Sequence, residues 1–150
     1  GDSRSMIISP SGDVHFATQD HTPQDDIARL QKGIDDGLDY ALPQCNLSRW
    51  WVTVGEYEYG VSRSLEGPLA TSKGIVSDAD VVTRAVLPGM IVVAATDGLW
   101  NVMDSVEVAR DLHKLRHEMK QSARDAAHTL SSMALQKGSD DNVSAVVVYL

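Results

Sequence analysis

Cysteine is almost absent from this chain, and its scarcity excludes two kinds of protein. Cys45 is the only cysteine in 150 residues. The chain therefore has no internal disulfide framework and no zinc site built from several cysteines. A reducing compartment suits such a composition, so we expect a cytoplasmic or nuclear protein. Set among Pro43, Gln44 and Asn46, the thiol is expected to be chemically inert.

Long apolar runs and an excess of positive charge are also missing. The longest apolar runs fall far short of the ~20 residues that a membrane-spanning helix needs, and no signal-like segment opens the chain. The formal net charge is −8, which argues against binding to nucleic acid or anionic membranes. We expect neither as a partner. A phosphorylated substrate stays open, because a bound divalent cation can reverse the local sign of charge.

What remains is the composition of an ordinary globular protein. Hydrophobic residues make up 43% of the chain and charged residues 23%, and 150 residues suffice for one domain with a buried core. We find no repeat and no low-complexity segment. The chain opens on Gly1 and Asp2 without an initiator methionine, so we expect a piece cut from within a larger domain.

Local patterns predict a β-hairpin and a helix in the first part of the chain. Residues 6–8 and 14–18 have strand character, and a turn-rich cluster separates them. A capping threonine followed by proline predicts a helix that begins near Thr22. Further along, residues 50–54 are expected to form a strand and residues 64–77 a loop.

The second part of the chain has clearer signals. The β-branched run at 81–86 predicts a strand, and the run at 90–95 lacks polar alternation, as a buried strand does. Sequences typical of capping boxes begin at Asp104 and Ser122. They predict one helix to about Lys120 and a second that ends near Gly138, before a final strand at 143–150.

Two short acidic motifs lie next to the two apolar strands. Thr-Asp-Gly-Leu-Trp at 96–100 follows the strand at 90–95, and Gly-Ser-Asp-Asp-Asn at 138–142 precedes the last strand. A carboxylate at the end of a buried strand is costly unless a cation, donors or water compensate it. Each motif alone is common turn chemistry, so the interest lies in their combination.

The two predicted helices suggest how these motifs meet. An antiparallel helix pair returns the chain to the side from which it left. If the two strands then pair as antiparallel neighbours, Asp97 and Asp141 share one edge of the sheet. Two carboxylates there suit Mg²⁺ or Mn²⁺, which prefer oxygen ligands. The nearby histidines lack the spacing of a helical zinc site, and Gly98 would let the backbone approach the ion.

Five motifs, in order, resemble those of the metal-dependent protein serine/threonine phosphatases of type 2C. They are Gly-Asp-Ser-Arg at 1–4, Thr-Gln-Asp-His-Thr-Pro at 18–23, Ser-Arg-Ser-Leu at 62–65, and the two acidic motifs. The resemblance implies an α+β fold, a partial α-β-β-α sandwich of mainly antiparallel sheets flanked by helices. Residues 1–150 would form the C-terminal portion of one phosphatase-like domain, whose N-terminal portion is missing from this chain.

The resemblance also implies a chemistry. It makes Asp97 and Asp141 ligands of a binuclear Mg²⁺ or Mn²⁺ centre and assigns Asp2 to an additional, weaker metal site. The implied reaction is hydrolysis of phosphoserine and phosphothreonine in a phosphorylated protein substrate. A metal-activated water attacks phosphorus, and no covalent phosphoenzyme is needed.

Departures from the family pattern qualify this expectation. The family's Asp-Gly-His-Gly-Gly motif, with its bridging aspartate and its histidine as proposed general acid, is absent, as is the upstream phosphate-binding arginine. We therefore expect no catalytic residue in this chain, an inactive isolated fragment, and self-association of the truncated sheet. Glu66-Gly67 and Asn101 also depart from the family motifs. They favour the alternative of a non-catalytic scaffold or interaction module, and a generic metal-binding domain is a weaker reading.

We expect several other polar and aromatic residues to have structural rather than catalytic roles. We expect Arg63 to be an ion-pair partner, and His15 and His21 to pack or cap. Trp100 should pack beneath the acidic loop.

Overall fold

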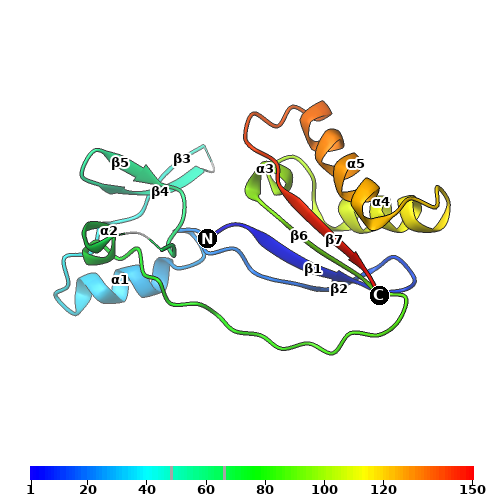
Figure 1. Ribbon diagram of the computed structural model, residues 1–150. Coiled ribbons are helices and arrows are strands. Elements are labelled where there is room, and N and C mark those ends of the chain that lie inside the picture. The colour runs from blue at the N-terminus through cyan, green and yellow to red at the C-terminus, as the bar shows by residue number, and fades with distance from the viewer. Residues whose placement is uncertain (48, 66) are drawn as a thin grey trace. The chain divides into compact units, whose positions relative to one another are not determined.

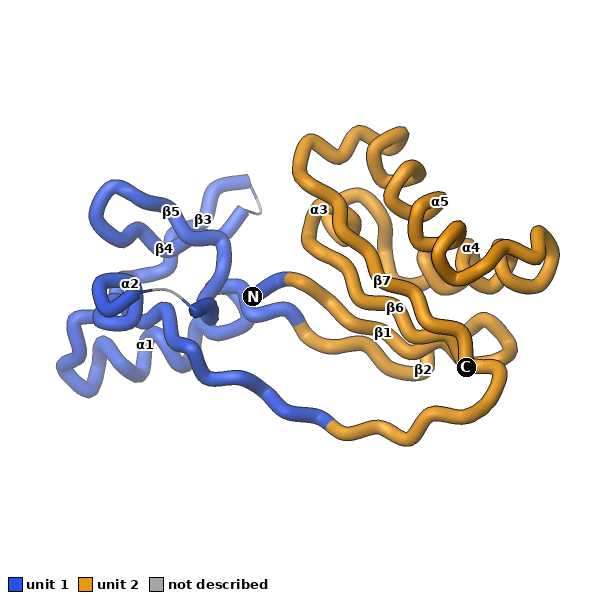
Figure 2. The backbone as a smooth tube through the Cα atoms, in the orientation of Figure 1, with its two compact units in different colours: residues 1–2, 20–82 blue, residues 3–19, 83–150 orange. Residues whose placement is uncertain are grey.

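The computed structural model describes residues 1–47, 49–65 and 67–150 (Figure 1). Two compact units make up the chain (Figure 2), and each is described by itself. The first unit comprises residues 1–2 and 20–82, and the second comprises residues 3–19 and 83–150.

The second unit is built on an antiparallel sheet with the strand order β2-β1-β6-β7. Its strands are β1 (Arg4–Ile8), β2 (Val14–Ala17), β6 (Ile91–Ala95) and β7 (Ala145–Tyr149). In the register, Met6 lies opposite Val93 and Ala95 lies opposite Ala145. The predicted hairpin and the buried strand at 90–95 are confirmed, with β6 between two neighbours.

Three helices complete this unit. They are the short α3 (Asp97–Trp100), α4 (Ser105–His117) and α5 (Ala123–Gln136). The side chain of Asp104 accepts the Glu107 N–H at 2.8 Å, and that of Ser122 accepts the Asp125 N–H at 3.2 Å. The predicted caps are therefore confirmed, and each satisfies an amide that a helix start leaves unpaired.

One face of the sheet and the facing sides of α4 and α5 bury the larger core. Met6, Ile8 and Val93 supply side chains from the strands, and Leu112 and Leu130 from the helices; all are fully buried. Burying one such side chain is worth roughly 1.5–3 kcal/mol. This packing holds the ends of β6 and β7 in place.

The first unit is smaller and has its own core. It contains α1 (Ile27–Asp35), β3 (Gln44–Asn46), β4 (Arg49–Val54), β5 (Tyr57–Tyr59) and α2 (Pro68–Ser72). The strands form an antiparallel sheet in the order β3-β4-β5. Its hydrophobic core consists of the buried side chains of Leu30, Val52, Val54, Ala70 and Ile75.

Three local expectations are wrong. The helix predicted from Thr22 begins at Ile27, because residues 23–26 form turns. The predicted loop at 64–77 contains α2, which has proline at its first position. Residues 81–86 form no strand, and Val81 is 88% exposed. Among the described residues, none of the helices has the length and apolarity needed to cross a bilayer.

Candidate metal centre

The pairing of β6 with β7 brings the two acidic motifs to one edge of the sheet. The strands are antiparallel, and their ladder ends with Ala95 opposite Ala145. Asp97 follows two residues after Ala95, and Asp141 precedes Ala145 by four residues. The predicted strand pairing is therefore confirmed. We call residues 96–98 and 139–144 the acidic edge.

Hydrogen bonds join the two halves of the acidic edge on either side of the aspartates. The Thr96 N–H donates to Ser144 O at 3.1 Å, and the Thr96 hydroxyl donates to Asn142 O at 3.1 Å. Beyond Asp97, the Ser139 hydroxyl donates to Gly98 O at 2.6 Å. Because these bonds flank both Asp97 and Asp141 in the sequence, they hold the two segments that carry the carboxylates together.

Gly98 is required for this close approach. A Cβ atom added to Gly98 would lie 2.4 Å from the carbonyl oxygen of Asn142, well inside van der Waals contact. The obstructing atom belongs to the backbone, so no side-chain rotation could relieve the clash. The glycine of the Asp-Gly pair thus admits the neighbouring loop, whereas the motif alone predicts that it admits an ion.

The carboxylates themselves have few partners. Asp97 is half-buried, and within the described part of the chain its carboxylate accepts no hydrogen bond and forms no ion pair. Asp141 is exposed, and its Oδ1 accepts the Asn142 N–H at 2.6 Å. A half-buried carboxylate without a donor or cation is stabilised by a metal ion or by water.

This donor set fits a hard cation, of which it would hold only part of the coordination shell. Carboxylate oxygens suit Mg²⁺ and Mn²⁺, and Mg²⁺ usually retains several waters. In residues 1–47, 49–65 and 67–150, no group of three or more His, Cys, Asp or Glu side chains could hold a metal ion. The acidic edge therefore offers two candidate ligands, Asp97 and Asp141.

Trp100 packs beside the acidic edge, as predicted. Its side chain is 8% exposed, and its Nε1–H donates to Ala95 O at 2.9 Å. The Arg4 guanidinium lies 5.1 Å from the centre of its ring, and Arg4 Nη1 donates to the hydroxyl of Ser105 at 2.9 Å. Contact between Arg4 and Trp100 connects the Gly-Asp-Ser-Arg motif to the first acidic motif within the second unit.

The remaining predicted metal ligand, Asp2, belongs to the first unit. Its place relative to Asp97 and Asp141 stays a prediction. Of the departures from the family motifs, Glu66 lies outside the described residues. Asn101 is exposed and caps the end of α3, where its N–H donates to Asp97 O at 2.8 Å.

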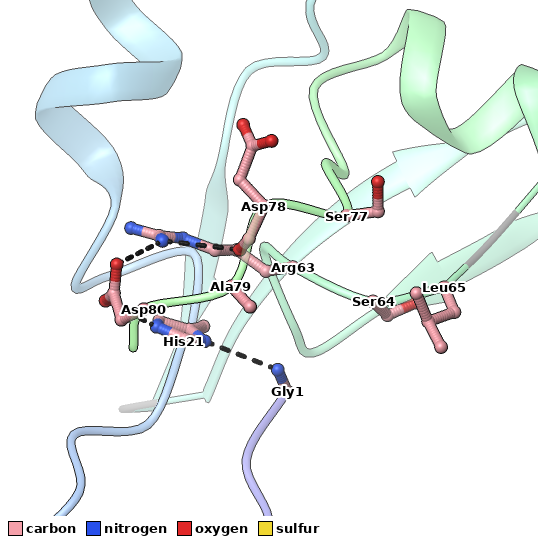
Figure 3. Close-up of a pocket in the computed structure, with 9 residues that line it drawn as sticks. All are labelled: Gly1, His21, Arg63, Ser64, Leu65, Ser77, Asp78, Ala79 and Asp80. Atoms are coloured by element: carbon pink, nitrogen blue, oxygen red, sulfur yellow. Dashed lines mark hydrogen bonds and ion pairs between the residues drawn. The ribbon is translucent and has the colours of Figure 1, made fainter. Parts of the chain in front are cut away.

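In the first unit, Arg63 is an ion-pair partner, as expected. Arg63 Nε and Nη2 donate to the two carboxylate oxygens of Asp26 at 3.0 and 3.2 Å. Its Nη1 donates to Asp80 at 3.0 Å, and Asp80 in turn lies 3.0 Å from His21 Nε2 (Figure 3). The side chains of Arg63, Asp80 and His21 line a pocket of about 310 Å³. His21 therefore pairs with a carboxylate, which the expected packing or capping role did not include.

Asp26 is the centre of this network, and nothing in the sequence pointed to it. Burial alone would raise the pKa of its carboxyl group. Hydrogen bonds from Arg63 and Ser62, together with the charges of Arg29 and Arg63, outweigh that effect and hold the pKa well below its usual range. The partners Asp26 and Arg63 lie 37 residues apart, so no local pattern could reveal them.

Known proteins resemble this chain along nearly its whole length. The family model of protein phosphatase 2C matches residues 44–143, and the chain belongs to that family. Protein phosphatase 1B of Mus musculus is 30% identical over 156 residues, covering 99% of this chain and 37% of the relative. Protein phosphatase 2C 77 of Arabidopsis thaliana is 31% identical, covering 100% of this chain and 38% of the relative. The chain thus spans a little over a third of these relatives.

Solved structures show the same fold. The serine-threonine phosphatase 2C from Toxoplasma gondii has a TM-score of 0.77 at 23% identity, covering 99% of this chain and 52% of that protein. A serine/threonine phosphatase from S. agalactiae has a TM-score of 0.62 at 18% identity, with coverage of 100% and 52%. The expected α+β fold of antiparallel sheets flanked by helices is confirmed.

Proposed function

We propose that this chain is part of a metal-dependent protein serine/threonine phosphatase, whose substrates are proteins carrying phosphoserine or phosphothreonine. One observation carries the proposal: the paired ends of β6 and β7 join the segments that hold Asp97 and Asp141. Membership of the protein phosphatase 2C family supports the reaction class. The single cysteine, Cys45, supports a reducing cytoplasmic or nuclear location as part of the same proposal.

In this proposal Asp97 and Asp141 are ligands of a binuclear Mg²⁺ or Mn²⁺ centre, and Asp2 contributes to a weaker additional site. When bound, such ions activate water and neutralise charge on the phosphoryl oxygens. The chain's own residues position these ligands. Gly98 admits the loop at 139–142, and Trp100 anchors the turn that follows Asp97.

The chain supplies only part of the phosphatase site. Within the described residues no group of three or more His, Cys, Asp or Glu side chains could hold a metal ion, and the chain covers a little over a third of its relatives. Residues 1–150 are proposed to be the C-terminal portion of one phosphatase-like domain. Any general acid and the remaining ligands would come from elsewhere in that domain.

Metal binding by the acidic edge tests the ligand assignment directly. Titration of the 150-residue chain with Mn²⁺, followed by electron paramagnetic resonance, should detect bound ion. The substitutions Asp97→Asn and Asp141→Asn should each weaken this binding at least about tenfold, since each removes an anionic oxygen ligand. Asp140→Asn is the matched control, because Asp140 is an exposed neighbour in the same loop. Equal Mn²⁺ affinity in all three variants would refute the assignment.

The scaffold alternative rests on two departures from the family motifs in the sequence, Glu66-Gly67 and Asn101. The full-length gene product distinguishes the two functions. If it is a phosphatase, Asp97→Asn and Asp141→Asn abolish Mg²⁺- or Mn²⁺-dependent release of phosphate from a phosphoserine peptide while the protein stays folded. If it is a scaffold, no release is measured with or without these substitutions.

A further inference from the structure

Two histidines lie one helical turn apart on α4, in a position that the phosphatase proposal does not use. His113 and His117 are four residues apart, so both project from the same side of the helix. Their ring centroids are 4.5 Å apart, and the ring planes are inclined by 34°. Two histidines at this spacing on a helix can bind one metal ion. The expectation that the histidines lack a helical zinc spacing is wrong for this pair.

A contact with a neighbouring turn orients the imidazole ring of His113 so that one of its nitrogens can bind a metal ion. His113 Nε2 lies 3.3 Å from the carbonyl oxygen of Pro10. A carbonyl oxygen only accepts, so this bond places the ring proton on Nε2 and leaves the lone pair of Nδ1 free. Metal-binding histidines commonly donate their other N–H to a backbone carbonyl in this way. Gly12 packs against the same ring, since a Cβ there would lie 3.0 Å from His113 Cγ.

The second ring is accessible and favours the neutral form. His117 is exposed at the end of α4. Partial desolvation lowers the pKa of its imidazole, and the positive charges of His113, Arg116 and Lys120 lower it further. A metal ion binds the neutral imidazole, and the exposed ring can be reached from solvent. The charges of Arg116 and Lys120 also repel a cation, so the affinity is expected to be modest.

The histidine pair lies at the opposite end of the sheet from the acidic edge. Arg116, between the two histidines in sequence, donates to Gly89 O and Met90 O at 3.0 and 2.9 Å and to Leu150 O at 2.8 Å. These carbonyls precede β6 and follow β7, whereas the acidic edge follows β6 and precedes β7. Within the described residues, no third His, Cys, Asp or Glu completes the group, which leaves the other coordination positions to water.

We propose that His113 and His117 form a two-nitrogen surface site on α4 for a late divalent transition metal ion such as Zn²⁺, Ni²⁺ or Cu²⁺. Imidazole nitrogen suits these ions, whereas Mg²⁺ prefers oxygen ligands. The site is independent of the proposed phosphatase function. Because coordination by both rings requires the helical conformation, a bound ion stabilises the folded chain over the unfolded one.

Zinc titration of the 150-residue chain tests this site. The background carries Asp97→Asn and Asp141→Asn, which removes the two proposed metal ligands of the acidic edge. Calorimetry at pH 7.5 should detect Zn²⁺ binding, and the histidine ring resonances of residues 113 and 117 should shift. His117→Gln should weaken binding at least about tenfold, comparable to the loss of a metal-site contact. His128→Gln, an exposed histidine on α5, is the matched control and should bind as the background does.

Two further readouts separate ligation from a structural effect. Lowering the pH from 7.5 to 5.5 should weaken binding, because protons compete with the metal ion for the imidazole nitrogens. Zn²⁺ should raise the unfolding temperature of the background protein, and His117→Gln should remove that increase without changing the temperature measured in EDTA. The proposal is overturned if Zn²⁺ does not bind up to ~1 mM, an affinity of only about 4 kcal/mol, or if His117→Gln binds as tightly as His128→Gln.

Discussion

At the scale of single residues, Gly98 connects the sequence motif to the geometry of the acidic edge. The motif indicated that glycine matters after Asp97, and the structure gives the reason, since the backbone of Asn142 occupies the space of a side chain. A residue with a Cβ would push the loop at 139–142 away from α3. The position of the carboxylate of Asp141 therefore depends on the absence of one methyl group.

We expect Gly98→Ala to lower the free energy of unfolding by about 1–3 kcal/mol, the usual cost of forcing extra volume into a packed site. It should also weaken Mn²⁺ binding, because the two halves of the acidic edge separate. Urea unfolding measures the first effect and metal titration the second. Gly60→Ala is the control, since a Cβ at Gly60 meets nothing within 4 Å. Equal stability of the two variants would contradict the packing argument.

At the scale of elements, the sequence predicted best where local chemistry decides the structure. The capping residues Asp104 and Ser122 mark the starts of α4 and α5, and the apolar run of β6 indicates burial on a sheet. The run at 81–86 has the same β-branched character but pairs with no strand among the described residues. Strand propensity reports how well side chains fit a sheet and does not supply a neighbouring strand.

Long-range polar contacts could not be predicted in this way. Asp26 joins the start of α1 to one distant segment through Ser62 and Arg63, and Ser62 donates to it at 2.7 Å. The sequence motif Ser-Arg-Ser-Leu indicated an ion pair for Arg63 but not its partners. Only the fold, which brings residues 26, 62 and 63 together, identifies the carboxylates involved.

The hydrogen-bonded network around Asp26 should make the stability of the folded chain depend on pH. Asp26→Asn should lower the free energy of unfolding at pH 7 by on the order of 3 kcal/mol. This is the lower end of the cost of breaking a buried ion pair, because Arg63 would still form its ion pair with Asp80. The pKa of Asp26 is depressed in the folded state, so its contribution is fully present above the unfolded pKa, ~3.9. As the pH falls below that value the contribution declines, and the stability difference between wild type and Asp26→Asn should shrink.

Urea unfolding between pH 3 and pH 7 measures both effects of Asp26→Asn. Asp36→Asn is the matched control. It removes an exposed carboxylate that pairs with Lys32 at the end of the same helix, and such surface pairs contribute about 0–1 kcal/mol. A stability difference for Asp26→Asn that grows as the pH falls would have the wrong sign and contradict the assigned network.

At the scale of the whole molecule, the second unit exposes apolar surface. β7 ends the strand order of its sheet, and Val146 and Val148 on it are 64% and 44% exposed. Its outer edge also carries backbone groups without a neighbouring strand in the described residues. Exposed edges of this kind invite pairing between chains, and self-association of the chain stays a prediction.

The isolated 150-residue chain should show little or no phosphatase activity. It carries only some of the proposed metal ligands and lacks the family's Asp-Gly-His-Gly-Gly motif, so the proposed acid and bridging aspartate are absent. Phosphate release from a phosphothreonine peptide in Mg²⁺ or Mn²⁺ measures this, with the full-length gene product as the positive control. Robust turnover by the chain alone would contradict the proposal that it supplies only part of the site.

The exposed segment at 81–86 has a consequence for limited proteolysis. The chain leaves the second unit after residue 19 and returns to it at residue 83. A protease cut within 81–86 would therefore divide the second unit between two polypeptides, one bearing β1 and the other β6. The antiparallel pairing of β1 with β6, from Arg4 opposite Ala95 to Ile8 opposite Ile91, would still hold the two polypeptides together without a covalent bond. The two fragments should therefore stay associated and complement each other.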